Sequence, residues 1–279
     1  MTAALIRVET AKIFRKWRTY IGFIAIFVLA LIVQTALYFE GENYLNMATR
    51  GIQNSFIFTG NLLNGYLVAY LILQTLFIHI PFLIVLVGGD LLAGEATGGT
   101  YRILITRPVS RSQIIFSKFS AGLIYTNLLL AALLFVSLIV SSLIYGTGEL
   151  IVLRDKVYIF SADDVLWRFL LAYGFATLSM GTVLAVSFLF SSLVENAIGP
   201  IVATMAIIII FIIISALPID ALQGVRPFLF TTHMDEWRLF FDDPVDYSRI
   251  LNSAAILTAH IIGLYFLTLW IFKKKDILS

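Results

Sequence analysis

Six long windows without a single Asp, Glu, Lys or Arg dominate this chain. They cover residues 19–39, 65–89, 119–145, 169–194, 196–219 and 250–272. A helix rises about 1.5 Å per residue and needs about 20 apolar residues to cross the roughly 30 Å of bilayer hydrocarbon. Spanning strands would instead show segments of about 10 residues with alternating polarity. The windows therefore predict an all-α integral membrane protein, built as a single transmembrane domain over residues 1–279.

The composition excludes the other broad classes of protein. Of the residues, 60% are hydrophobic and 13% are charged, whereas soluble domains are roughly 45–50% apolar and about 25% charged. A chain of this size must still cover its surface with polar atoms, so a soluble enzyme, a nucleic-acid-binding module and a disordered scaffold are excluded. The chain has no cysteine, which excludes a secreted domain held by disulfides.

The distribution of charge predicts which side of the membrane each segment occupies. Only Glu195 separates the fourth and fifth windows, so we expect a tight hairpin there, because a single helix would be about twice the bilayer thickness. If the N-terminus is inside, the inner segments hold 12 of the 19 Lys and Arg residues but only five of the 17 acids. The positive-inside rule then places both termini in the cytoplasm.

The first 18 residues predict an amphipathic helix on the inner membrane surface. At helical pitch the apolar residues, among them Trp17, share one sector of about 100°, and the basic residues Lys12, Arg15 and Lys16 lie outside it. Trp17 would anchor the helix at the interface and the basic residues would meet anionic headgroups. The alternative is a frayed tail that serves only to orient the chain.

No motif for catalysis or metal binding is present. The P-loop, His-Glu-x-x-His and Gly-x-Ser-x-Gly patterns are missing, and His79, His233 and His260 do not have the spacing of metal ligands. An ion- or proton-coupled carrier normally keeps a charged relay at membrane depth. Here only His79 and His260 offer one, and a hydrogen-bonded packing role is the simpler interpretation of both. Energy for transport would then come from another subunit.

The segment 90–118, between the second and third windows, is the most informative part of the chain. Gly94, Gly98 and Gly99 favour a break in the helix, and Pro108 forces its preceding residue out of helical conformation. Ser110 is placed to cap the helix that follows. The segment therefore predicts a short structured element in the cytoplasm and not a featureless loop.

Residues of this segment resemble the signature loop of ABC-2 type permeases, the membrane subunits of ABC exporters. They run from Gly94 and Glu95 through Gly98, Gly99 and Thr100, and then from Thr106, Arg107 and Pro108 to Ser110, Arg111 and Lys118. The match is closest to the bacterial branch, in which the ATPase is a separate polypeptide. The resemblance extends to the layout of an interfacial helix followed by six spans, as in type V exporters.

The resemblance implies how such a chain works. The loop would contain a coupling helix that docks on a cytoplasmic P-loop ATPase, which carries the ATP and Mg²⁺, so this chain itself binds no cofactor. Two permease copies, identical or related, would sit in a bacterial cytoplasmic membrane. The residues implied in coupling are Gly94, Glu95, Gly98, Gly99, Thr100, Arg102, Arg107, Pro108 and Arg111. The alternative is that these charges only enforce topology and keep a loop solvated.

The segment 218–249 is unusually aromatic for a solvated outer loop. Phe228, Phe230 and Trp237 suggest either a re-entrant structure that forms an external gate, as in related exporters, or an anchor in the interfacial aromatic belt. Its acids offer a surface for an extracytoplasmic partner, or are simply its solvated face.

Three functions remain open from the sequence. The first is the permease of an ATP-driven exporter with no enzymatic activity of its own. The second is an ABC-type membrane anchor that transmits force to an extracytoplasmic partner without moving cargo. A secondary carrier is disfavoured because the relays are missing.

Overall fold

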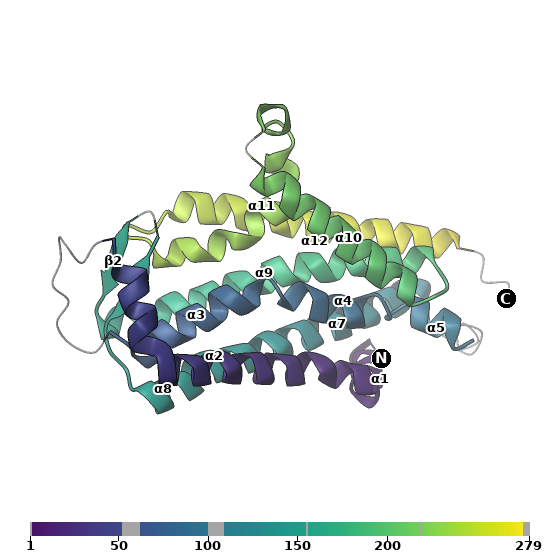
Figure 1. The fold of residues 1–279 in the computed structure, drawn as a ribbon. Helices are drawn as coiled ribbons and strands as arrows, with labels where there is room; N and C mark the ends of the chain where they lie inside the picture. Colours follow the sequence, from purple (N-terminus) through teal and green to yellow (C-terminus); the bar gives the residue numbers. More distant parts are fainter. Residues whose placement is uncertain (1, 52–61, 100–108, 155, 218, 276–279) are drawn as a thin grey trace.

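The computed structural model describes residues 2–51, 62–99, 109–154, 156–217 and 219–275. It confirms the predicted fold class, because the chain is 83% helical and six of the helices in this part are long and apolar enough to cross a membrane. The helices run side by side as one elongated bundle, and a small hairpin covers the end opposite the N-terminus (Figure 1).

The elements follow one another in this order. They are α1 (Thr2–Arg15), α2 (Trp17–Thr49), α3 (Gly65–Phe77), α4 (Ile80–Gly88), α5 (Ala93–Thr97), α7 (Arg111–Leu134), η1 (Phe135–Val140), α8 (Ser141–Tyr145), β1 (Leu150–Leu153), β2 (Val157–Phe160), α9 (Ala162–Leu193), α10 (Ile198–Ala216), η2 (Asp220–Leu222), η3 (Arg226–Phe228), α11 (Phe230–Met234), η4 (Asp235–Phe241) and α12 (Tyr247–Lys274).

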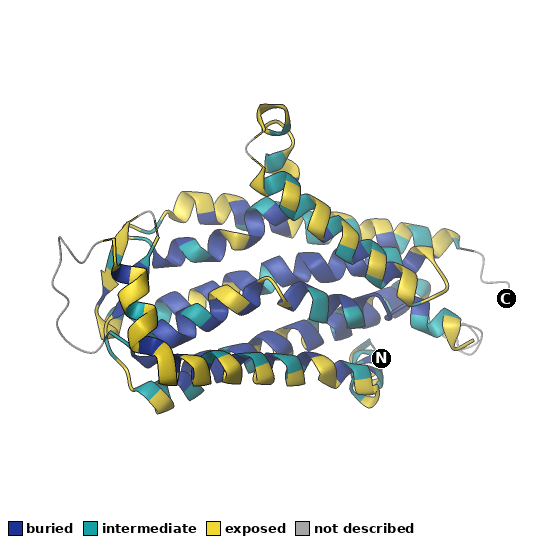
Figure 2. Cartoon of the chain, viewed as in Figure 1, coloured by how far each residue is buried: buried dark blue, intermediate teal, exposed yellow. Residues whose placement is uncertain are grey.

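The core of the bundle is built around α9. Its most apolar window is 72% buried, against 28% for α2 and 17% for both α10 and α12. Figure 2 shows this difference as a dark central helix with mixed or exposed faces on the outer ones. In a membrane an exposed apolar face meets lipid or another helix. α9 is therefore the central helix of the bundle, and the exposed faces of α2, α10 and α12 are available for other contacts.

The second predicted span is not one helix. α3 ends at Phe77 and α4 begins at Ile80, so the chain breaks at Ile78 and His79. Pro81 stands in the first turn of α4, where its missing N–H costs no intrahelical bond. The break therefore lies directly before the one proline of this charge-free window.

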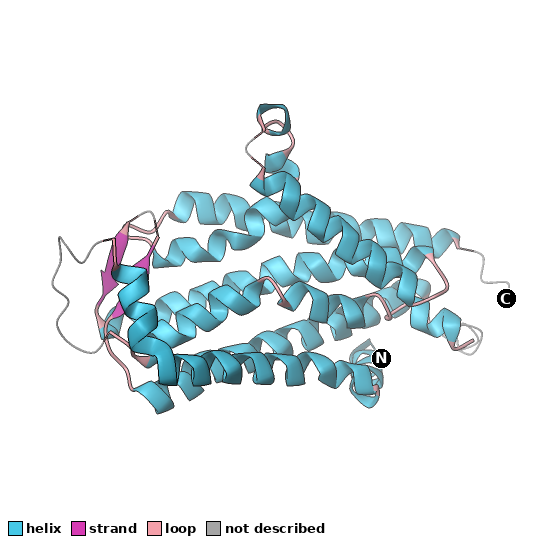
Figure 3. Cartoon of the chain, in the orientation of Figure 1, coloured by secondary structure: helices cyan, strands magenta, loops and turns pink. Residues whose placement is uncertain are grey.

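The segment between the third and fourth predicted spans contains a short two-stranded sheet. Leu150–Leu153 and Val157–Phe160 form an antiparallel hairpin, in which Leu150 pairs with Phe160 (Figure 3). Its residues are β-branched, aromatic or leucine, and most of them suit a pleated surface. Asn64 fastens this end of the bundle, because its side chain caps α3 and donates a hydrogen bond to the carbonyl of Glu149.

The aromatic segment before the last helix folds back against the bundle. In η4, Trp237 is fully buried, and its ring centroid lies 5.4 Å from that of Phe77 in α3. Phe241 packs 5.0 Å from Tyr70 in α3 and 5.0 Å from Phe169 in α9, again between ring centroids. These contacts place η4 among the spanning helices, so it belongs to the core.

Candidate functional site

The termini and the 90–118 segment meet at one end of the bundle. Figure 1 shows α1, α5 and the end of α12 at the same end, opposite the hairpin. α1 packs mainly on α7, and α5 contacts α9. The segments that the charge distribution assigns to the cytoplasm thus lie next to one another.

A sharp turn at Lys16 directs α1 across this end of the bundle. Lys16 has extended backbone angles, with φ −87° and ψ 128°, and separates α1 from α2. The hydroxyl of Thr19 donates to the carbonyl of Ile13, which closes the turn. α1 is thereby held against the first turns of α7, and its residues Glu9 and Ile13 are buried.

Four side chains of alternating charge form a closed ring between α1, α5 and α7. Lys118 Nζ lies 2.7 Å from Glu9 Oε2 and 2.8 Å from Glu95 Oε1. Lys12 Nζ lies 2.8 Å from Glu9 Oε1 and 2.9 Å from the same Glu95 oxygen. Each ammonium therefore bridges both carboxylates, and the ring has no net charge.

Burial makes this ring energetically important. The side chain of Lys118 is only 2% exposed, and those of Glu9 and Glu95 are 7% and 12% exposed. Taking such groups out of water is costly unless each charge keeps its partners, so the loss of one member leaves the others unpaired. Burial alone would lower the pKa of Lys12, but its hydrogen bonds to Glu9 and Glu95 raise that pKa above the ordinary lysine value.

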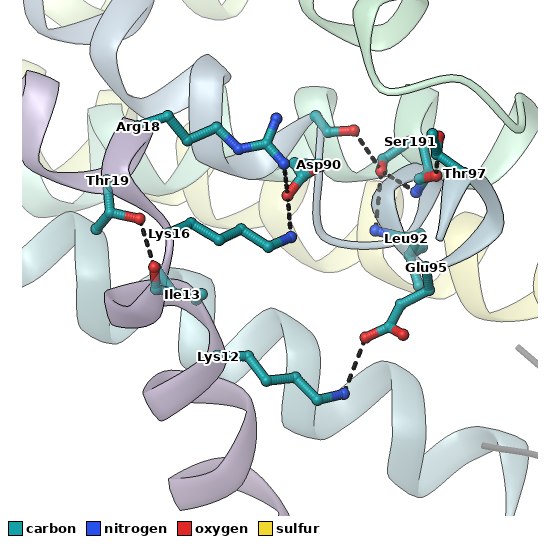
Figure 4. A network of polar contacts seen from close by, with 12 residues as sticks. Lys12, Ile13, Lys16, Arg18, Thr19, Asp90, Leu92, Glu95, Thr97 and Ser191 are labelled. Atoms are coloured by element: carbon teal, nitrogen blue, oxygen red, sulfur yellow. Dashed lines mark hydrogen bonds and ion pairs between the residues drawn. The ribbon is translucent and has the colours of Figure 1, made fainter. Parts of the chain in front are cut away.

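A second cluster, centred on Asp90, lies beside the ring (Figure 4). The Asp90 carboxylate forms ion pairs with Lys16 and Arg18, which flank the turn between α1 and α2. Gly94 packs directly on Asp90, and a Cβ at that position would collide with the carboxylate. The two clusters enclose a cavity of about 30 Å³, which is room for a water molecule.

Ser191 of α9 supports the break between α4 and α5. Its Oγ accepts hydrogen bonds from the backbone N–H of Leu92 and of Ala93, at 3.0 and 2.9 Å, and donates to the carbonyl of Gly89 (Figure 4). In the same region Thr97 donates to the carbonyl of Glu195, in the turn that joins α9 to α10. One central helix thus fixes the backbone on which Glu95 stands.

Arg111 fastens the other side of the 90–118 segment. Its Nη1 donates to the carbonyls of Phe272, Lys273 and Lys275, at 3.1, 2.8 and 2.9 Å. These are carbonyls at the end of α12, where a helix has no intrahelical donors left and where a cation is favourable. Ser110 caps α7 in a reciprocal box with Gln113, which confirms the predicted cap.

The remaining residues that the resemblance implies in coupling are placed only in part. Thr100, Arg102, Arg107 and Pro108 lie outside the described residues. Gly98 caps α5 with ordinary helical angles, whereas Gly99 has a φ of +62°, which is the left-handed region that favours glycine.

The predicted interface anchor divides into two pairs. Lys12 and Lys16 form the ion pairs described above, with side chains that are 40% and 45% exposed. Trp17 is 77% exposed and Arg15 is also exposed, so this pair faces outward. The amphipathic pattern predicts headgroup contacts for all three basic residues, but Glu9 pairs with Lys12. The signal was the spacing of Glu9 and Lys12, which share a face of a helix.

The residues suggested as an outer gate also separate. Phe230 and Trp237 are buried in the bundle, whereas Phe228 is 74% exposed. Several of the acids in this region have partners in the chain: Glu236 pairs with Arg249, Asp242 with Arg154, and Asp246 caps α12.

The histidines have local hydrogen bonds, and of the three only His233 is buried. The Nδ1 atoms of His79 and His260 each lie 2.9 Å from the carbonyl four residues earlier. His233 bridges Ser253 and the carbonyl of Pro227. Within the residues described, no group of three or more metal-ligating side chains gathers.

Comparison with known proteins agrees with this architecture. No curated protein matches the chain. The sequence profile of a family described as ABC-2 family transporter protein matches residues 3–277, which is nearly the whole chain. The charged clusters connect the first helix of this multi-pass membrane protein to the segment that resembles a permease signature. The chain therefore belongs to the ABC-2 family of transporter proteins and is a membrane component of an ABC transporter.

Proposed function

We propose that this chain is the permease subunit of an ATP-driven exporter. It would sit in a bacterial cytoplasmic membrane with both termini in the cytoplasm, and a separate P-loop ATPase would bind beside the 90–118 segment. ATP and Mg²⁺ would be bound by that partner. The permease itself would convert the partner's movement into rearrangement of the spanning helices.

The observation that carries this proposal is the ring of Glu9, Lys12, Glu95 and Lys118. A force applied to the 90–118 segment reaches Glu95 on α5, and the ring joins α5 to both α1 and α7. α1 continues into α2 through the turn at Lys16, where Asp90 holds a second contact. Coupling needs a rigid path of this kind between the docking segment and the spans.

The working unit is proposed to contain two permease copies. Only 28% of the apolar window of α2 and 17% of that of α10 is buried, and in the related exporters the first and fifth spans line the dimer axis. These faces support a homodimer, or a heterodimer with a related permease, whose shared axis encloses the transport path.

The test is to purify the tagged chain from its native membrane in mild detergent, identify its partners by mass spectrometry and measure ATP hydrolysis and transport. We expect a stoichiometric P-loop ATPase. Glu95→Gln removes one charge from the ring with little change in shape, so it should uncouple hydrolysis from transport while membrane insertion is unchanged.

The matched control is Glu42→Gln, because Glu42 is an exposed carboxylate in α2, outside both clusters. It should behave as the wild type does. Full transport by Glu95→Gln, or transport by the purified chain without any ATPase, would contradict the proposal. A purified complex that hydrolyses ATP and moves no cargo would instead favour the membrane-anchor alternative.

A further inference from the structure

α10 leaves the bundle partway along its length and opens a wedge beside the broken second span. Near its start, α10 packs on Gly89 through Ile201. Near its end, Ser215 bonds instead with Thr231 and Thr232 of α11. Figure 1 shows α10 running obliquely to the other long helices, with its end beside α11. α11 and η4 fill the wedge only partly.

The unfilled part of the wedge is a pocket of about 300 Å³. Its apolar wall includes Phe77, Ile78, Ile212 and Met234, and its polar wall includes Gln74, Ser215, Thr231, Thr232, Asp235 and Arg238. This size and this mixture of one apolar wall and a few convergent polar groups are typical of sites for small molecules.

The pocket lies at the break in the second predicted span. Ile78 precedes Gly89, at the end of α4, by 11 residues, which is about 16 Å at 1.5 Å per residue and about half of the hydrocarbon thickness. The inward fold of η4 therefore brings Arg238 and Asp235 beside a spanning helix, although neither lies in an apolar window. Charged residues beside a spanning helix mark a functional site by default.

The positive charge in this region is incompletely satisfied. Arg238 Nη2 lies 3.6 Å from Asp235 Oδ2, a long contact between neighbours on one helical turn. Its Nε is buried and has no hydrogen-bond partner within the described part of the chain, and the same holds for Nε and Nη2 of Arg226. Arg226 is joined to the pocket wall through its backbone carbonyl, which accepts a bond from Thr232.

We propose that this pocket binds an amphiphile with an acidic headgroup, whose carboxylate or phosphate meets Arg238 while its hydrocarbon chain lies against Phe77 and Ile212. An oxyanion would gain charge-assisted hydrogen bonds that Asp235 does not supply. That such an amphiphile is the transported substrate rests on the proposed function. That it binds here rests only on the pocket.

The test uses Trp237, which is buried behind Phe77 and beside Arg238. A variant with Trp17, Trp167 and Trp270 replaced by Phe leaves Trp237 as the only tryptophan. In lipid nanodiscs, 2-bromododecanoate carries its quenching bromine next to the carboxylate and should reduce Trp237 fluorescence saturably. Its methyl ester has the same chain and bromine without the charge, and should not.

Two substitutions assign the effect to the pocket. Arg238→Gln should weaken the binding of the acid about tenfold, because charge-assisted hydrogen bonds are lost. Asp235→Asn removes the competing carboxylate and should strengthen it. A variant that keeps only Trp270, on the exposed face of α12, reports bromine dissolved in the lipid and should respond equally to acid and ester.

Equal quenching of Trp237 by acid and ester, or the absence of saturable quenching, would overturn the inference. So would binding of the acid that neither substitution changes. This measurement needs no ATPase, so its result is independent of the partner purification. Acid binding by a chain that recruits no ATPase would retain the site and refute the proposed function.

Discussion

The ammonium of Lys118 lies 2.7 Å from the carboxylate of Glu9, although 109 residues separate them in the chain. Through this contact the first helix of the protein is fixed to α7 at Lys118, the last residue of the 90–118 segment. The surroundings are dry enough that the pair is stable only with both members and with Glu95 present. The N-terminal helix is thus part of the bundle.

Removing the buried cation should destabilise the whole domain. Lys118→Met leaves Glu9 and Glu95 with Lys12 alone, so we expect a loss of about 3–5 kcal/mol in the free energy of unfolding. Denaturant unfolding in a fixed detergent measures this loss. Lys156→Met is the control, because Lys156 is exposed on the hairpin.

A second experiment tests whether Glu9 and Lys118 act together. Glu9→Gln should cost less in the Lys118→Met background than it does alone, since the two residues share one interaction. Additive costs would contradict the ring.

Ser191 and Ser192 are neighbours in α9. Comparing their alanine variants tests whether Ser191 stabilises the break between α4 and α5, apart from any general effect of a serine in a helix. Ser191→Ala removes the acceptor for two buried N–H groups, those of Leu92 and Ala93, and should destabilise the protein by about 1–3 kcal/mol. Ser192 is equally buried, but its hydroxyl bonds only within α9, to Leu189, so Ser192→Ala should cost much less. Thermal unfolding of both variants in the same detergent makes the comparison. Equal shifts would show that Ser191 does not support the break.

The sequence predicted the helical class because charge-free windows of membrane length have few other solutions in lipid. It left open whether the aromatic segment folds back among the helices or lies in the interfacial belt, because the contact of Trp237 with Phe77 depends on tertiary packing between distant segments. The same limit applies to Lys12. On its own helix Lys12 belongs to the polar face. Its ammonium turns toward the protein only because Glu95, from a distant part of the chain, pairs with it. The hydrophobic periodicity of a helix describes that helix alone. It does not reveal which residue of another element will contact it.

The cap that Arg111 supplies to α12 should control the end of the last helix. Arg111→Gln removes the charge and most of the donors that hold the carbonyls of Phe272, Lys273 and Lys275, so the last turn of α12 should fray. Hydrogen exchange at the amides of the last turn should become at least several-fold faster, while the middle of α12 is unchanged. Arg111→Lys keeps the charge at the helix end and should show a smaller effect. Unchanged exchange in Arg111→Gln would show that the cap is dispensable.

The proposed dimer predicts a specific pattern of cross-links along α10. Val202 and Ile209 are 60% and 47% exposed and lie seven residues apart, so they share one face of the helix. Because the chain has no cysteine, Val202→Cys or Ile209→Cys introduces the only thiol. If two copies meet through this face, mild oxidation in native membranes should give a linked dimer with one or both variants. Ile208→Cys is the matched control: Ile208 is adjacent in sequence but fully buried against the bundle, so it should remain monomeric. If Ile208→Cys links and Ile209→Cys does not, α10 turns its other face to the partner. If no exposed position on α2 or α10 links, these helices do not line the dimer axis.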